Sequence, residues 1–217
     1  MLPKSGILAS MKKANLFLNG SFTDYGEGID RKLYTIAADG GVVNALKNAC
    51  RPAAIVGDGD SIQEAPVSLK KEIALIPFIH TPDQDFTDFE KALRFLQSQG
   101  YTYINVFCFD GERIDHMLSG LSICSGFETL TIILHTHSQI VMKVPHSFFL
   151  QIKTGTTVSL LPFPTASHVS TTGLQWELSD ATLDLGGFLS VSNKTTQSKI
   201  NIRYTKGTLF LFRPIKI

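Results

Sequence analysis

Short acidic and glycine-rich segments carry the residues that are most able to do chemistry in this sequence. In Gly57-Asp58-Gly59-Asp60-Ser61, two aspartates stand two positions apart after an apolar run. Carboxylates at i and i+2 on an extended segment point to the same side, so Asp58 and Asp60 could share one hard cation. The same residues could instead form a turn in which they accept backbone N–H bonds. Alone, the segment leaves both alternatives open.

A second acidic segment runs from Thr81 to Asp88 and contains Asp83, Asp85 and Asp88. Aspartates in the first turn of a helix stabilise it by about 0.3 to 1 kcal/mol each, so a structural role is possible. Crowded carboxylates also repel one another, and a bound divalent cation offsets that repulsion. The two acidic segments together therefore favour a metal site more than either does alone.

Two further segments could contact an anion. In DGERIDH (110–116), Arg113 could neutralise a phosphate at a helix start, or it could form a surface ion pair with Asp115 worth under about 1 kcal/mol. We interpret His116 as an orienting or packing residue, because phosphoryl transfer depends mainly on positioning and charge. In ADGG (38–41), Gly40 and Gly41 let backbone approach a ligand, although a simple turn is the alternative. The sequence contains neither GxxxxGK[ST] nor GxGxxG.

The elements that must position these residues alternate along the first 130 or so positions. Five apolar runs predict buried strands, and the first four end in Gly together with Asp or Asn: NLFLNG, LYTIAADGG, AAIVGDGDS, YINVFCFDG and TLTIILH. Such strands suit a parallel sheet covered by helices. Ligands of open parallel sheets bind at the carboxyl ends of the strands, which is where these Gly and Asp residues fall.

Two helices are predicted beside the charged segments. Thr87 can cap the first while Glu90 reaches back to it. Its apolar face would contain Phe89, Ala92, Leu93 and Leu96. A second helix should begin close to Arg113 and Asp115, and its apolar face would contain Ile114, Met117, Leu118 and Leu121.

From about residue 138 the pattern changes to short alternating segments rich in Thr, Ser and Gly, without a helical period. We therefore predict an α/β N-terminal domain with a mainly parallel sheet at 1–137, followed by a smaller all-β sandwich domain at 138–217.

The bulk composition agrees with a globular protein. Of 217 residues, 43% are apolar and 18% are charged, and the formal net charge is +1. This near-neutral chain has no global field for nucleic acid or an anionic membrane, and no run approaches the ~20 apolar residues of a membrane helix. The opening residues lack a signal-peptide pattern, so a soluble, cytoplasmic protein is expected. The three cysteines form no CxxC pair, and we expect them to be reduced and mostly buried.

Taken in order, ADGG, GDGDS, TPDQDFTDFEKAL and DGERIDHML resemble the motif series of the thiamine pyrophosphokinase family. In the β-rich half, GLQWEL (173–178) and LSVSN (189–193) resemble two further segments of that family. The resemblance spans roughly residues 36 to 193. It implies Mg²⁺-dependent transfer of the β,γ-pyrophosphoryl group of ATP to the hydroxyl of thiamine, by a homodimer that binds thiamine between its subunits.

The resemblance also implies residue roles. Asp58, Asp60 and Asp88 would be Mg²⁺ ligands and catalytic residues, together with Asp115 as a catalytic residue. ATP would be bound by Asp39, Gly40, Gly41, Asp83, Asp85, Thr87 and Arg113. Thiamine would be bound by Gln84, Asp115, Trp176, Ser190 and Asn193.

Some positions depart from the family pattern, and some alternatives stay open. Asn44 is shifted by one place from the Asn that often follows the paired glycines, and Gly59 stands where the family usually has a bulky apolar residue. Without the resemblance, Trp176 would more readily be interpreted as a core residue. The alternative functions are a related pyrophosphokinase that acts on another small alcohol, such as a hydroxymethylpterin, and a non-catalytic sensor of thiamine or nucleotide.

Overall fold

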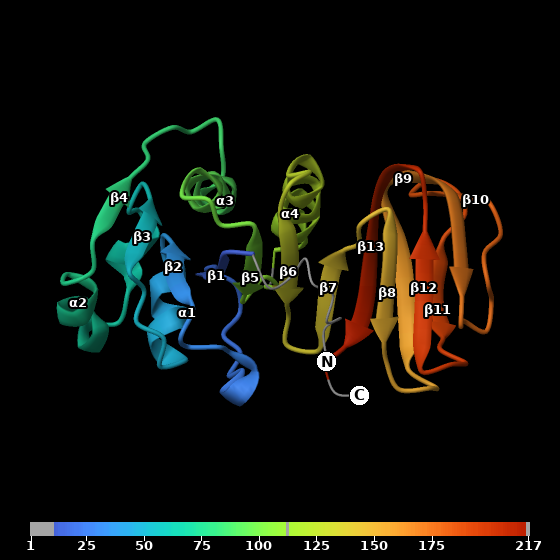
Figure 1. Ribbon diagram of the computed structural model, residues 1–217. Coiled ribbons are helices and arrows are strands. Elements are labelled where there is room, and N and C mark those ends of the chain that lie inside the picture. Colours follow the sequence, from blue (N-terminus) through green and yellow to red (C-terminus); the bar gives the residue numbers. More distant parts are fainter. Residues whose placement is uncertain (1–10, 112, 216–217) are drawn as a thin grey trace. The chain divides into compact units, whose positions relative to one another are not determined.

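The computed structural model describes residues 11–111 and 113–215, and these divide into two compact units. The α/β unit contains Met11–Ile123 and Phe127–His137, and the β unit contains Cys124–Gly126 and the described residues from Ser138 onward. Figure 1 shows the helices and parallel strands of the first unit and the antiparallel strands of the second. The prediction of an α/β domain followed by an all-β domain is confirmed.

A parallel sheet forms the centre of the α/β unit. Its strands lie in the order β4-β3-β2-β1-β5-β6. Their bounds are β1 Lys13–Phe17, β2 Tyr34–Ala38, β3 Ala54–Gly57, β4 Phe78–His80, β5 Tyr103–Phe107 and β6 Thr131–His135. The order reverses between β1 and β5, so the segments that follow these two strands diverge and leave a crevice at their carboxyl ends.

Helices cover this sheet because its strands are apolar on both faces. The helices are α1 Gly41–Lys47, α2 Val67–Ile73, α3 Asp88–Ser98 and α4 Ile114–Gly126, with 3₁₀ turns η2 Gly26–Gly28 and η3 Ser61–Glu64. The core against α1 and α2 contains Phe17, Ala37, Val42, Ala45, Ile55, Ile73 and Phe107. Helix α3 contacts β2 and β3, so the start of α3 is held near the carboxyl ends of those strands.

The first predicted helix is α3, and its apolar face is confirmed. Phe89, Ala92, Leu93 and Leu96 are buried. The Thr87 hydroxyl accepts the backbone N–H of Glu90 at 3.2 Å, as expected for an N-cap. The Glu90 carboxylate, however, does not reach back to Thr87. It accepts from Arg94 at 2.7 Å, because an i,i+4 guanidinium on the same helix offers it a charged partner.

We expect Thr87→Ala to lower the free energy of unfolding by about 1 kcal/mol, since the first turn of α3 loses its cap. Urea denaturation followed by circular dichroism measures this change. Thr87→Ser retains a hydroxyl acceptor and serves as the control, with stability near that of the wild type. Equal losses in both variants would contradict the capping role.

The second predicted helix is α4, but part of its apolar face is wrong. Ile114 and Leu118 are 70% and 55% exposed, whereas Gly120 and Cys124 are buried. A Cβ on Gly120 would lie only 2.5 Å from the Phe109 ring. The small residue therefore lets the helix approach Phe109 closely, and this contact, rather than the largest apolar side chains, decides which side of α4 faces inward.

The β unit is built around one long antiparallel strand. Its strands are β7 Gln139–Lys143, β8 Ser147–Gln151, β9 Thr157–Thr172, β10 Ala181–Asp184, β11 Ser190–Lys194, β12 Lys199–Arg203 and β13 Lys206–Pro214. Strand β9 pairs with β10, β11, β12 and β13, and its last residues pair with β12 in a second sheet that also contains β8. Two sheets therefore share one strand.

None of the helices among the described residues has the length and apolar character needed to cross a membrane. Cys50, Cys108 and Cys124 are free and buried, as predicted. Burial raises the pKa of each of these thiols, and it raises that of Cys124 to about 12. A raised thiol pKa disfavours the nucleophilic thiolate at neutral pH.

Candidate active site

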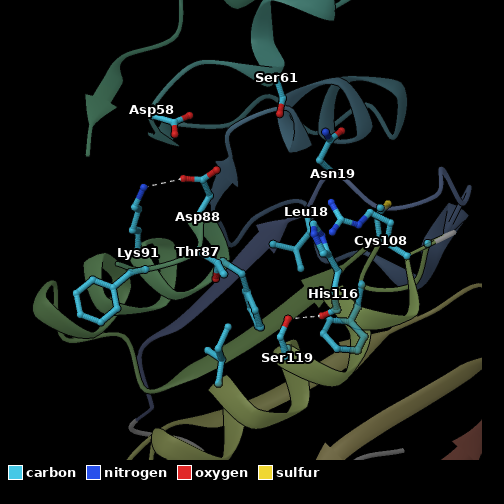
Figure 2. A pocket seen from close by; sticks show the side chains of 18 of the residues that line it. Leu18, Asn19, Asp58, Ser61, Thr87, Asp88, Lys91, Cys108, His116 and Ser119 are labelled. Atoms are coloured by element: carbon cyan, nitrogen blue, oxygen red, sulfur yellow. Dashed lines mark hydrogen bonds and ion pairs between the residues drawn. The ribbon is translucent and has the colours of Figure 1, made fainter. Parts of the chain in front are cut away.

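A cleft of about 850 Å³ lies at the carboxyl ends of the parallel strands of the α/β unit (Figure 2). Its wall includes Leu18–Ser21 after β1 and residues 108, 109 and 111 after β5, which are the two strands where the sheet order reverses. The remaining lining residues are Asp58, Ser61, Gln84, Asp85, Phe86, Thr87, Asp88, Phe89, Lys91, Arg113, His116, Ser119, Gly120 and Ile123. The cleft thus joins an acidic region to an apolar one.

Three carboxylates converge at the acidic end. Asp39 follows β2, Asp58 follows β3 and Asp88 begins α3, and each offers an oxygen within 4.8 Å of the others. The Asp39 residue is only 3% exposed. Its Oδ2 accepts the backbone N–H of Ser61 at 2.8 Å, while its buried Oδ1 has no hydrogen-bond partner among the described residues. A buried carboxylate oxygen without a partner is costly, and an oxygen-seeking cation such as Mg²⁺ fits this position.

The surroundings shift the pKa values of Asp58 and Asp88 in opposite directions. The Asp58 carboxylate accepts from Gln84 Nε2 at 3.1 Å and from the backbone N–H of Asp60 at 3.3 Å, and these bonds lower the pKa of Asp58. Burial raises the pKa of Asp88, although a hydrogen bond from Lys91 Nζ at 3.2 Å opposes this effect. The Asp39 and Asp58 charges also raise the pKa of Asp88, so a cation between them would favour its ionised form.

Asp60 lies outside the group of three carboxylates. It is exposed at the start of η3, and its N–H bond to Asp58 is the turn that the sequence left as an alternative. Asp39, which the family resemblance implied only for ATP binding, takes the third place beside Asp58 and Asp88. The register Ala38↔Val56 sets Asp39 beside Gly57, where a Cβ would lie 2.9 Å from the Asp39 Cβ. Gly57 at the end of β3 therefore makes room for Asp39, and it is the feature of the sequence that indicates this close contact.

The loop before α3 brings some predicted residues to the cleft and leaves one outside its lining. Gln84, Asp85 and Thr87 line the cleft, whereas Asp83 does not belong to its lining. Asp83 accepts the backbone N–H of Asp85 at 2.8 Å in an exposed turn.

Gly59 has φ +92°, and a Cβ there would lie 3.3 Å from the Phe78 ring. Glycine at this position is thus explained by backbone conformation and by Phe78.

Arg113 and Asp115 form the surface ion pair that the sequence allowed. Their side chains are 66% and 63% exposed, and Arg113 Nε donates to Asp115 Oδ1 at 3.2 Å. The guanidinium lowers the pKa of Asp115. Arg113 and His116 line the cleft, and Figure 2 shows the Ser119 hydroxyl bonded to the backbone oxygen of His116. Arg113 can therefore exchange a weak exposed partner for an anion in the cleft.

The segment after β1 is a wall of the cleft that the sequence interpretation missed. Asn44 is 5% exposed, and its Nδ2 donates to the backbone oxygens of Leu18 and Gly20, both at 2.9 Å. A Cβ on Gly40 would lie 2.7 Å from Asn19, and one on Gly41 would lie 2.3 Å from the Phe17 oxygen. Gly40 and Gly41 therefore make room for the segment after β1, and Asn44 holds it by hydrogen bonds. In the sequence, the dipeptide Asn19-Gly20 after an apolar run indicates a turn at this place.

In the β unit, the structure brings together three residues predicted to bind thiamine. Trp176 is 57% exposed, so it is not a core residue. Its backbone N–H donates to Asn193 Oδ1 at 3.1 Å, and Asn193 Nδ2 donates to its carbonyl at 2.7 Å. Asn193 also contacts the Ser190 hydroxyl at 3.4 Å, and both residues are buried. Asn193 therefore fixes the backbone that presents the Trp176 ring.

Comparisons with known proteins agree on one family. The family model described as thiamin pyrophosphokinase, catalytic domain, matches residues 25–134, and that described as thiamin pyrophosphokinase, vitamin B1 binding domain, matches 142–209. A thiamine pyrophosphokinase of Bacillus subtilis is 26% identical over 189 residues, which cover 85% of this chain and 88% of that protein. Thiamine pyrophosphokinase 1 of Arabidopsis thaliana is 27% identical, and the match covers 73% of this chain but only 64% of the plant protein.

Solved structures share the fold. The crystal structure of thiamine pyrophosphokinase from Bacillus subtilis has a TM-score of 0.82 at 23% identity, covering 95% of this chain and 100% of that one. The enzyme from Candida albicans has a TM-score of 0.77 at 16% identity, covering 96% and 90%. At these identities the likeness establishes the fold of both units, while the family models establish the relationship.

Proposed function

The chain belongs to the thiamin pyrophosphokinase family, and we propose that it transfers the β,γ-pyrophosphoryl group of ATP to the hydroxyl of thiamine, giving thiamine diphosphate and AMP. The observation that carries this proposal is the cluster of Asp39, Asp58 and Asp88 in the matched catalytic region, two of which, Asp58 and Asp88, line the cleft. Phosphoryl transfer needs little covalent chemistry from the protein, so a site that positions charge is sufficient.

The proposed cofactor is Mg²⁺, with Asp58 and Asp88 as ligands and the unpartnered Oδ1 of Asp39 as support for a cation beside them. Asp60 remains a proposed ligand on the family resemblance, since it stands two residues after Asp58. When bound, Mg²⁺ supplies positive charge that holds phosphate oxygens and offsets the charge that develops on the leaving AMP.

The chain's own residues orient the substrates. Arg113 gives up its exposed pair with Asp115 and binds phosphate with its planar guanidinium. Thr87 and the segment after β1 offer hydroxyl and backbone groups to the nucleotide. Asp115, released from Arg113, or Asp88 accepts the proton of the thiamine hydroxyl as the hydroxyl oxygen bonds to the β-phosphorus of ATP and the bond between that phosphorus and the departing AMP oxygen breaks.

The β unit is proposed to supply the thiamine pocket of a homodimer. Trp176 presents its ring to the cationic thiazolium, supported by Ser190 and Asn193. Trp176, Leu185, Phe188 and Val191 are all at least 45% exposed, which supports a surface that a second subunit covers. Cytoplasmic location is part of the proposal, because free buried cysteines suit a reducing compartment.

One coupled assay tests the function. Purified protein is incubated with ATP and thiamine, with and without Mg²⁺, and AMP and thiamine diphosphate are measured. We expect both products in equal amounts and only with the divalent cation. If a hydroxymethylpterin gave AMP and thiamine did not, the acceptor would be wrong. Binding of ATP and thiamine without turnover would instead support the sensor alternative.

A further inference from the structure

A buried lysine lies beside the acidic cluster and has no part in the function described so far. Lys91 stands one turn after Asp88 on α3, and its side chain is only 6% exposed. Its ammonium donates to Asp88 Oδ1 at 3.2 Å. Figure 2 shows Lys91, Asp88 and Asp58 at the same end of the cleft. Burying an ammonium is costly, so its position at this site calls for a physical reason.

The donors of Lys91 exceed the acceptors around it. An ammonium carries three N–H donors. Within residues 11–111 and 113–215, Asp88 is the one acceptor within hydrogen-bonding distance of it. Because Lys91 also lines the cleft, its other donors are available to an oxygen of a molecule bound there. A simple ion pair between residues three apart on a helix would not require the ammonium to be buried at the cleft with donors left for another oxygen.

The formal charges point the same way. Asp39, Asp58 and Asp88 carry three negative charges when ionised, and Lys91 adds one positive charge beside them. One divalent cation then completes the balance, so the cluster becomes neutral before a phosphate group enters. Without Lys91, the loaded cluster would keep a net negative charge and repel the phosphates.

We propose that Lys91 is a fixed cation of this site, which balances part of the carboxylate charge beside Asp88 and donates a hydrogen bond to a phosphate oxygen of the bound nucleotide. This inference rests on the proposed function, because it assigns a residue to the same site. It makes Lys91 a charge-balancing residue beside Asp88 and a binding residue for the transferred phosphates. It also predicts that removing the charge has opposite effects on metal and nucleotide.

The test is Lys91→Met, measured with two probes. In the absence of nucleotide, Mn²⁺ should bind about threefold more tightly or better, because a nearby positive charge is gone. Binding of α,β-methylene ATP, which cannot release AMP, should weaken about threefold or more in excess Mg²⁺, because a charge-assisted bond is lost. Electron paramagnetic resonance of free Mn²⁺ and calorimetry give the two affinities without any turnover.

Matched variants separate this role from a structural one. Arg94→Met removes the same charge from the same helix at an exposed position, and it should leave both affinities unchanged. Lys91→Arg retains the charge and should keep Mn²⁺ affinity near the wild-type value. Thermal unfolding checks the fold, and Lys91→Gln replaces Lys91→Met if the latter does not fold.

Affinities that are unchanged, or that fall together, in Lys91→Met would overturn the role of Lys91. If the wild type bound both probes in that case, the proposed function would stand without this inference. Wild-type protein that bound neither Mn²⁺ nor the nucleotide analogue would refute the metal site and the role of Lys91 together.

Discussion

Asp58→Asn is expected to lower kcat/KM for MgATP roughly 10²- to 10³-fold, the loss typical when a preorganised charge-stabilising group is removed from an active site. Asp58 belongs to the group of three carboxylates, and its bonds from Gln84 and from the N–H of Asp60 lower its pKa and keep it anionic. The Asn side chain keeps one oxygen but loses the charge. The measurement is the initial rate of AMP and thiamine diphosphate formation over a range of MgATP concentrations.

Asp24→Asn is the matched control. Asp24 accepts the backbone N–H of Gly26 at 2.9 Å, a turn like that of Asp58 and Asp60, but it lies outside the acidic cluster. Its rates should equal those of the wild type. Asp60→Asn in the same series tests the predicted third ligand, and near-normal turnover would remove Asp60 from the metal site. Wild-type rates in Asp58→Asn would refute the assignment of the cluster itself.

Trp176→Ala is expected to raise KM for thiamine about 5- to 30-fold, which corresponds to a cation–π contribution of about 1 to 2 kcal/mol. The Trp176 ring is exposed, and its backbone is held on both sides by Asn193, so the ring is presented and not packed away. KM for ATP should change little, because the cleft of the α/β unit is untouched. Steady-state kinetics with each substrate varied in turn measures both constants.

Two further variants sharpen this expectation. Trp176→Phe keeps a smaller aromatic face and should fall between the wild type and Trp176→Ala. Phe22→Ala removes another exposed ring, which already has the Lys47 ammonium 5.3 Å from its centre, and it should leave both constants unchanged. A Trp176→Ala protein that lost ATP and thiamine affinity equally would indicate a general structural defect instead of a thiamine contact.

The strands that carry the cleft could be predicted from sequence because each is a continuous apolar run, and those of β1, β2, β3 and β5 are followed by Gly with Asn or Asp. β1, β2, β3, β5 and β6 all form where such runs occur. The edge strand β4 has three residues, none of them buried, and α1 and α2 have seven residues each, so none of these gives a clear period. Helix α4 was placed correctly, but its inward side depends on Gly120 and Phe109, which no apolar period reveals.

The arrangement of the candidate site was only partly predictable for a similar reason. Asp58 and Asp88 were singled out from local acidic segments, and the structure places them together. Asp39 joins them because of the register between β2 and β3, which is a relation between distant segments. No feature of the local sequence singles out Lys91, whose side chain is buried on a helix that contacts β2 and β3.

The pairing of strand β9 with four other strands determines how the β unit opens to solvent. Its sixteen residues pair with β10, β11, β12 and β13, so opening this strand would leave β10 and β11 without their partner strand and would remove one of the two partners of β12 and of β13. The amide protons of β9, β10 and β11 should therefore exchange with solvent in one cooperative event. The segment that contains Trp176 begins directly after the last residue of β9. The Trp176 ring therefore lies close in sequence to the strand that pairs with four others.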